Sequence, residues 1–129
     1  MKNLFLVAGT AFLVVFATNV AQAQFTVENN TDCSYDIGIQ YGTTACGNNG
    51  TIFGTVHPGS TDFYPPASDV GYTFRIYDGK VDPTVGSGCS GLAPDVTVPD
   101  YCSDGVTVHD VHISFDANLA PQGYVEIYY

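Results

Sequence analysis

CSYDIGIQY, residues 33–41, decides the fold class of this chain because its side chains alternate with a period of two. Cysteine, tyrosine and isoleucine fall on one face of an extended chain, and serine, aspartate, glycine and glutamine fall on the other. An apolar face backed by a small and polar face is typical of a strand with one side on a core and one side in water. The stretch therefore predicts a half-buried β-strand.

The same alternation recurs along the chain, and the segments that show it are separated by turn-forming glycine, proline, asparagine and aspartate. The further expected strands are residues 25–30, 51–57, 60–64, 70–77, 95–98, 106–115 and 124–129. About eight strands without a convincing helix indicate an all-β fold. We expect a small antiparallel β-sandwich of immunoglobulin-like or related topology.

Residues 106–115, VTVHDVHISF, break the regular alternation. Val106 and Val108 have one parity, and the apolar residues from Val111 onward have the opposite one, so a regular strand would expose some of them. A one-residue β-bulge at His109-Asp110 would return them all to one face, and this is what we expect. A strand buried on both sides is the alternative.

Residues 1–23 have the pattern of a secretory signal peptide. Lys2 gives a positive start, residues 4–20 are largely apolar, and Ala21-Gln22-Ala23 is a small-x-small cleavage site. We expect cleavage after Ala23, no membrane anchor in the processed chain, and a single domain over residues 24–129. The protein is thus predicted to be secreted, either extracellular or held at a cell surface.

The chain is strongly acidic, with 3 lysines and arginines against 13 aspartates and glutamates, a formal net charge of −10. Removal of Lys2 with the leader leaves 2 cations against 13 acids, a net charge of −11. Such a surface is repelled by phosphate backbones and by anionic lipids. The composition therefore argues against nucleic acid and membrane surfaces as partners.

Four cysteines, Cys33, Cys46, Cys89 and Cys102, all follow the leader and predict two disulfides formed in an oxidising compartment. The absence of a C-x-x-C pair disfavours zinc. If each connection simply reverses the chain, Cys33 and Cys89 lie at one end of the sandwich and Cys46 and Cys102 at the other. The expected pairs are then Cys33–Cys89 and Cys46–Cys102.

No motif supplies a nucleophile, a base and an orienting group together, so we expect no catalytic residues and no enzymatic activity. His109 and His112 fall on opposite faces of a regular strand, which favours ordinary surface or turn histidines over a metal pair. Glu28 and Glu126 lie on the first and last strands, and a sandwich this small seldom builds the cleft that a glycosidase pair needs.

Loop aspartates make calcium the one candidate cofactor, because calcium binds hard carboxylate oxygens. These residues are Asp78, Asp82, Asp95, Asp100 and Asp104. No EF-hand spacing is matched, so a solvated acidic surface without any metal is the simpler interpretation.

Tyrosines near strand ends are the candidate ligand-binding residues, namely Tyr64, Tyr77, Tyr101 and Tyr128. A tyrosine ring offers a flat apolar face with a polar tip, so these side chains would suit a polysaccharide or a protein contact. The alternative is that they cap the ends of the core. Two N-glycosylation sequons, at Asn29 and Asn49, matter only in a host that glycosylates them.

Both ends of the processed chain are predicted strands, residues 24–30 and 124–129, with uncharged and aromatic edges suited to pairing with a neighbouring copy. We therefore expect an extracellular structural or adhesion subunit that binds itself or another extracellular protein and self-assembles through its terminal strands. A carbohydrate-binding module that uses exposed tyrosines, assisted by calcium, is the alternative. The alternative is that the terminal strands pair within their own sheet and close it.

Three segments in a fixed order resemble the opening strands of thaumatin-like proteins: FTVENNTDCSY at 25–35, HPGS at 57–60 and FRIYD at 74–78. The resemblance covers about half of the processed chain. The family's further cysteines and larger acidic-cleft domain, to which its glucan-binding and antifungal activities belong, have no counterpart in this sequence. What the resemblance implies is the fold, a sandwich of thaumatin-like topology.

Overall fold

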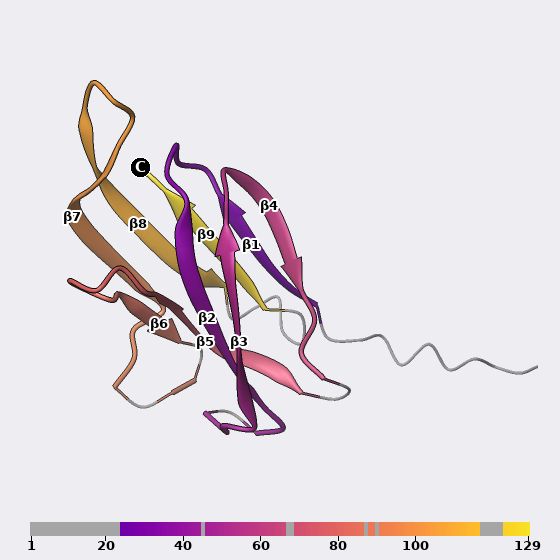
Figure 1. Cartoon of the computed structure of the whole chain (residues 1–129). Coiled ribbons are helices and arrows are strands. Elements are labelled where there is room, and N and C mark those ends of the chain that lie inside the picture. The colour runs from indigo at the N-terminus through magenta and orange to yellow at the C-terminus, as the bar shows by residue number, and fades with distance from the viewer. Residues whose placement is uncertain (1–23, 45, 67–68, 87, 90, 117–122) are drawn as a thin grey trace, which may run out of the picture.

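The computed structural model describes residues 24–44, 46–66, 69–86, 88–89, 91–116 and 123–129. The expected signal peptide lies outside them. These residues form nine strands and no helix (Figure 1). None of them belongs to a helix long and apolar enough to cross a membrane. The strands are β1 (Phe25–Asn29), β2 (Tyr35–Gly42), β3 (Gly50–Val56), β4 (Gly59–Phe63), β5 (Val70–Ile76), β6 (Thr84–Gly86), β7 (Asp95–Ser103), β8 (Val108–Asp116) and β9 (Tyr124–Tyr128).

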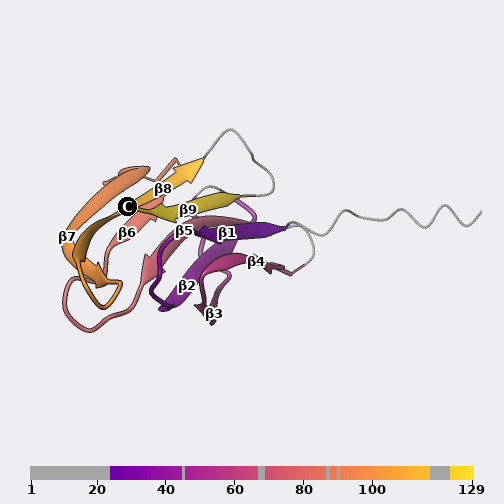
Figure 2. The same cartoon turned by 90° about the horizontal axis from the view of Figure 1, so that it is seen from above.

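The strands form two sheets packed face to face, which confirms the predicted sandwich (Figure 2). One sheet has five strands in the order β4-β1-β9-β8-β7, and the other has four in the order β3-β2-β5-β6. Neighbouring strands are antiparallel except β1 and β9, which are parallel. The predicted antiparallel sandwich thus contains one parallel pair of strands.

Both terminal strands lie inside the five-stranded sheet. β1 has β4 on one side and β9 on the other, and β9 lies between β1 and β8. Their edges are thus already paired within the chain, and the expectation that they offer free edges to another copy is wrong. The terminal strands close their own sheet.

β2 shows the alternation that its sequence predicts. Tyr35, Ile37 and Ile39 are 6%, 1% and 0% exposed and point into the core. The strand pairs with β3 on one side and with β5 on the other, so it occupies the interior of the four-stranded sheet. Its polar face forms the outer surface on which the candidate site lies.

Phe25 of β1 is the side chain that joins the two sheets. It is fully buried, with its ring centroid 6.4 Å from that of Phe74 and 5.6 Å from that of Phe115. Gly71 and Gly123 lie directly against the ring, where a Cβ atom would clash with it. The sequence therefore leaves space on both sheets for one large aromatic group.

A β-bulge occurs, but on β7 rather than at His109-Asp110. Val98 pairs with Val111 and Cys102 pairs with His109, so residues 99–101 lie opposite Asp110 alone. Pro99 lacks the N–H that a regular ladder needs, and Asp100 has a φ of 51°, which accommodates the extra length.

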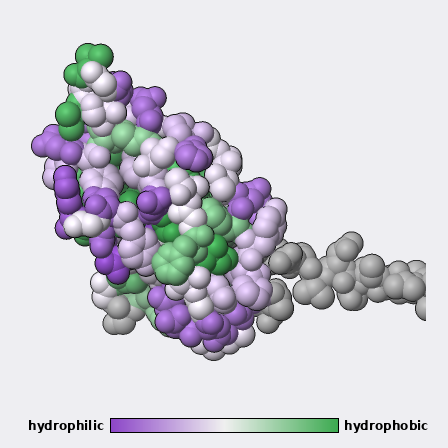
Figure 3. All heavy atoms as spheres, viewed as in Figure 1, coloured by the Kyte–Doolittle hydropathy of each residue, from purple (hydrophilic) through white to green (hydrophobic). Residues whose placement is uncertain are grey.

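β8 itself remains a regular strand. Val108 is therefore 54% exposed rather than returned to the core face, and Val106, in the bend before β8, is 94% exposed. They lie where the β7–β8 hairpin extends beyond the rest of the sandwich, and Figure 3 shows apolar surface at this tip.

The disulfides are Cys33–Cys102 and Cys46–Cys89, so the two expected pairs are wrong, although all four cysteines are paired. The cause is β6, which lies between the expected strands 70–77 and 95–98, where no strand was predicted. β6 runs antiparallel to β5 and reverses the chain once more than expected, which brings Cys89 to the end where Cys46 lies. β7 then returns Cys102 to Cys33. Two disulfides indicate folding in an oxidising compartment.

Asn29 organises the turn between β1 and β2 through buried hydrogen bonds. The side chain is 1% exposed, and its Nδ2 donates to the carbonyl oxygen of Cys33 at 2.7 Å. Its Oδ1 accepts from the backbone N–H and the hydroxyl of Thr31 at 3.1 and 2.7 Å. Each polar atom of this buried amide thus has a partner in the turn that leads to Cys33.

Replacing Phe25 with alanine should lower the free energy of unfolding by about 3 to 5 kcal/mol, because the cavity would open between both sheets. Phe53→Ala is the matched control, since Phe53 is 70% exposed and its loss should change stability by less than about 1 kcal/mol. Urea unfolding with intact disulfides measures both. Equal losses in the two variants would contradict the packing described for Phe25.

Candidate functional site

Tyr77 is the centre of the candidate site. It directly follows β5, and its backbone N–H donates to the carbonyl oxygen of Asp36 at 2.8 Å, which keeps it beside β2. Gly38 of β2 lies beneath the ring, where a Cβ atom would be 2.7 Å from a ring carbon. The missing side chain at Gly38 therefore lets the Tyr77 ring lie close to the outer face of the sheet.

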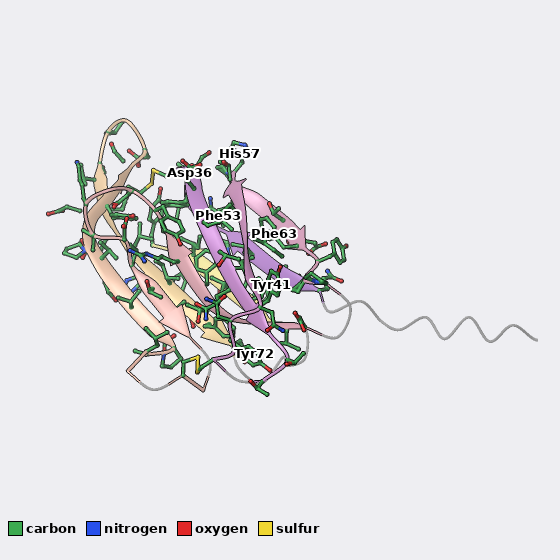
Figure 4. All side chains as sticks on the ribbon, turned by 60° about the horizontal axis from the view of Figure 1, so that its bottom comes forward. Asp36, Tyr41, Phe53, His57, Phe63 and Tyr72 are labelled. Atoms are coloured by element: carbon green, nitrogen blue, oxygen red, sulfur yellow. A yellow bond between two sulfur atoms is a disulfide. The ribbon has the colours of Figure 1, made fainter. Side chains whose placement is uncertain are left out.

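Phe53 and Arg75 flank that ring because of strand register. Phe53 of β3 and Arg75 of β5 are both paired with Gly38 of β2, on opposite sides of it. The Phe53 and Tyr77 ring centroids are 5.8 Å apart, and the Arg75 guanidinium carbon lies 4.9 Å from the Tyr77 centroid. Figure 4 labels Phe53 on β3 beside Asp36 on β2. We call Phe53, Tyr77 and Arg75 the aromatic row.

Arg75 is held in the row by an ion pair. Its Nη2 lies 3.1 Å from Oδ2 of Asp82, in the loop between β5 and β6. Its Nε is buried and has no hydrogen-bond partner among the described residues. The guanidinium is therefore held beside the tyrosine ring, and its buried Nε–H has no acceptor among the described residues.

One side of the aromatic row borders a groove of about 290 Å³. Its floor is the outer face of the four-stranded sheet, and the Cys46–Cys89 disulfide and Leu92 close its far end. The floor is lined by Gly38, Gln40, Thr51, Thr73 and Thr84. We call this the threonine groove, because three of the residues that line it are threonines.

The other side borders a wider hollow of about 570 Å³, between the β5–β6 loop and the bulge of β7. It contains three tyrosines, three aspartates and one lysine, and we call it the acidic pocket. Those residues are Tyr35, Tyr77, Tyr101, Asp36, Asp78, Asp100 and Lys80. The carboxylates and the lysine offer hydrogen-bonding atoms beside an aromatic surface.

The β5–β6 loop at the edge of this pocket is held by two aspartates that bond its backbone. Asp78 Oδ1 accepts from the N–H groups of Lys80 and Val81 at 2.7 and 2.9 Å. Asp82 Oδ1 accepts from the N–H groups of Asp78 and Gly79 at 2.9 and 3.1 Å. These hydrogen bonds preorganise the loop.

Tyr101 faces Asp78 across the acidic pocket. Its ring stacks on Tyr35 with centroids 6.1 Å apart, and its buried hydroxyl makes no hydrogen bond of ordinary geometry within the described chain. Burial and the nearby Asp78 carboxylate raise the pKa of Tyr101 far above its usual value. The Tyr101 hydroxyl and the amides of the β5–β6 loop hold the pKa of Asp78 well below its usual range.

The structure brings together four of the residues predicted to bind a ligand or metal. Tyr77, Tyr101, Asp78 and Asp100 all line the acidic pocket.

Two of the predicted tyrosines do not join this site. Tyr64 lies beyond β4, and Tyr128 of β9 stacks on His112 with centroids 5.2 Å apart. The four predicted tyrosines thus form no single platform.

The predicted calcium ligands are spread along the chain. Asp82 pairs with Arg75, and Asp95 lies in a separate hollow beside Glu126. Asp104 accepts a 2.9 Å hydrogen bond from His109, which with two backbone amides lowers the pKa of Asp104 to about 2. In the described part of the chain, no three His, Cys, Asp or Glu residues are grouped as metal ligands.

Three residues of the site were not predicted from the sequence, namely Phe53, Arg75 and Asp36. Phe53 carried one usable signal, since it falls on the otherwise polar parity of residues 51–57. Its proximity to Arg75 depends on the register of three strands, which alternation alone does not fix.

Comparisons of the chain with protein-family models, with curated proteins and with solved structures find no match. The resemblance to thaumatin-like proteins stays a prediction. The function is therefore argued from the geometry of the site.

The raised pKa of Tyr101 predicts alkaline sensitivity. A folded-state pKa above the unfolded value contributes stability below about pH 10, and this contribution is lost as the pH rises further. The free energy of unfolding should thus fall above pH 10. Absorbance titration of tyrosinate should show that Tyr101→Phe removes a late-titrating group.

Asp78→Asn tests the cause of that shift. Removing the carboxylate should lower the Tyr101 titration midpoint and weaken the alkaline loss of stability. An unchanged midpoint would show that Asp78 does not act on Tyr101.

Proposed function

We propose that the protein is a secreted, non-catalytic adhesion domain that binds a polysaccharide at Tyr77. The aromatic row between the threonine groove and the acidic pocket is the observation that carries this proposal. The apolar face of a sugar ring packs on an aromatic side chain, while its hydroxyls bond to neighbouring polar groups. Phe53 is 70% exposed and Tyr77 is 38% exposed, so the row offers aromatic surface, with hydroxyls, an amide and carboxylates on either side of Tyr77.

The charges of the site favour a neutral, polyhydroxylated ligand. Asp36, Asp78 and Asp100 accept hydrogen bonds, and Arg75 and Lys80 donate them. A sugar hydroxyl both donates and accepts, so a chain of sugars satisfies both kinds of group without a charge of its own. An anionic polymer would be opposed by the three carboxylates and by the acidic chain as a whole.

The pKa of Asp78 and the hydrogen bonds of the carboxylates support binding rather than catalysis. Glycoside hydrolysis needs a carboxylic acid with a raised pKa that donates a proton to the leaving group. The pKa of Asp78 is lowered instead, and its Oδ1 is occupied by loop amides. Asp36 accepts a 2.7 Å hydrogen bond from Thr55. These groups are arranged to hold structure and to accept hydrogen bonds.

Secretion fits the same proposal. Two disulfides indicate an oxidising compartment, and the leader pattern of residues 1–23 would deliver the chain there. An exported domain that binds polysaccharide acts as an adhesion module when its chain or its partner is attached to a cell surface.

Affinity electrophoresis through gels containing glucan, mannan, galactan, xylan or soluble chitin tests the proposal. At least one polysaccharide should retard the protein, and Tyr77→Ala should weaken binding by on the order of tenfold or more, as loss of a central aromatic contact does. Tyr128→Ala is the matched control, because Tyr128 is 37% exposed and Tyr77 is 38% exposed. It should bind normally.

Two results would reject this function. One is a protein whose mobility no polysaccharide in the panel changes. The other is equal weakening by Tyr77→Ala and Tyr128→Ala, which would place the contact away from the aromatic row.

A further inference from the structure

The sandwich has four edge strands in the described part of the chain, and three of them are protected against pairing with another copy. β4 carries Asp62, and β7 carries Pro99, Asp100 and the bulge. β6 has only 3 residues, and the N–H of Gly86 at its end is bonded to the carbonyl oxygen of Ala93. Charges, proline, bulges and short length are the usual devices that keep edges unpaired.

β3 has none of these devices. Its seven residues, GTIFGTV, contain no charge and no proline. Their register with β2 is continuous from Gly50 to Val56, so the strand is straight enough to accept a second neighbour. In a chain with a formal net charge of −10, an uncharged edge is where two copies meet the least electrostatic repulsion.

The two faces of β3 differ in exposure. Val56 is buried on the inner face, where the ring of Phe63 lies against Gly54 (Figure 4). Phe53 lies on the outer face at the centre of the strand and is 70% exposed. An exposed phenylalanine in the middle of an uncharged edge strand favours pairing with another strand and does not protect the edge.

We propose that two copies of this chain pair through β3, antiparallel about a two-fold axis at Phe53. Pairing joins the two four-stranded sheets into one continuous sheet and places Phe53 opposite Phe53 of the second copy. Thr51 then lies opposite Thr55 of the second copy, and the inner faces of both sheets stay on the same side. Such a contact is self-complementary, as a two-fold interface must be.

The contact satisfies the outward backbone N–H and C=O groups of β3 and adds a cross-strand pair of aromatic rings. One strand from each copy buries less surface than a standard permanent interface, so the association should be weak and dependent on concentration. It does not depend on polysaccharide binding, and every measurement below is made without polysaccharide.

Cysteine cross-linking tests the axis. Residues opposite each other in an antiparallel pair have Cα atoms roughly 4.5 to 5.5 Å apart, within disulfide range. Phe53→Cys should therefore give covalent dimers under mild oxidation, many-fold faster than Val106→Cys. Val106 is 94% exposed at the hairpin tip and reports random collision.

Register is tested with single cysteines at Thr51 and Thr55. Each lies two residues from the axis, so identical residues of the two copies are roughly 13 Å apart and should not cross-link alone. A mixture of Thr51→Cys and Thr55→Cys proteins should cross-link only between unlike copies. Cross-linking of each variant with itself would overturn the proposed register.

Light scattering across concentration tests the unmodified protein. The weight-average mass of the wild type should rise towards twice the monomer value, whereas Phe53→Glu should stay monomeric because it would oppose two carboxylates. Its urea unfolding should match that of Phe53→Ala, which shows that the fold survives. A wild type that stays monomeric at every concentration, or Phe53→Cys that cross-links no faster than Val106→Cys, would overturn the proposal.

Discussion

The parallel contact between β1 and β9 is the constraint on which the rest of the structure depends. It places the first and last described strands in the middle of the five-stranded sheet. Without it, β4 and β1 would separate from β9, β8 and β7, and Phe25 would lose its position against Phe115. Because this contact joins opposite ends of the chain, its loop-closure entropy must be overcome before the core is complete, which favours slow folding.

Strand positions followed from the sequence because one rule governs them, namely that alternating side chains face one core. Features that depend on which strands are neighbours could not be predicted from this alternation. β6 has 3 residues, too few to show a period of two. Because this strand was not predicted, both disulfides were assigned to the wrong partners. The exposed Val108 obeys the alternation of β8, but the sequence did not show that the hairpin leaves the sandwich there. Nor does alternation within β1 or β9 reveal whether that strand is an edge.

Part of the candidate site could be predicted from the chemistry of single residues. Tyr77, Tyr101, Asp78 and Asp100 were chosen for their chemistry, and they meet because the β5–β6 loop faces the bulge of β7. The aromatic row required more, since Phe53 and Arg75 become neighbours of one ring only through their shared pairing with Gly38. A glycine in the middle of a strand carries no chemistry of its own. Its place in the register turns three separate side chains into one surface.

The buried amide of Asn29 bears on the choice of production host. Asn29 heads one of the two sequons, and an oligosaccharyltransferase would attach its glycan to the same nitrogen that donates to Cys33. A chain modified there during translocation would be unable to form the β1–β2 turn or to bring Cys33 to Cys102. Asn49 heads the other sequon and is exposed, and its Nδ2 donates to Asp69 at 3.2 Å rather than to a buried turn. Expression in a eukaryotic secretory pathway would therefore yield misfolded, partly reduced chains unless Asn29 escaped modification.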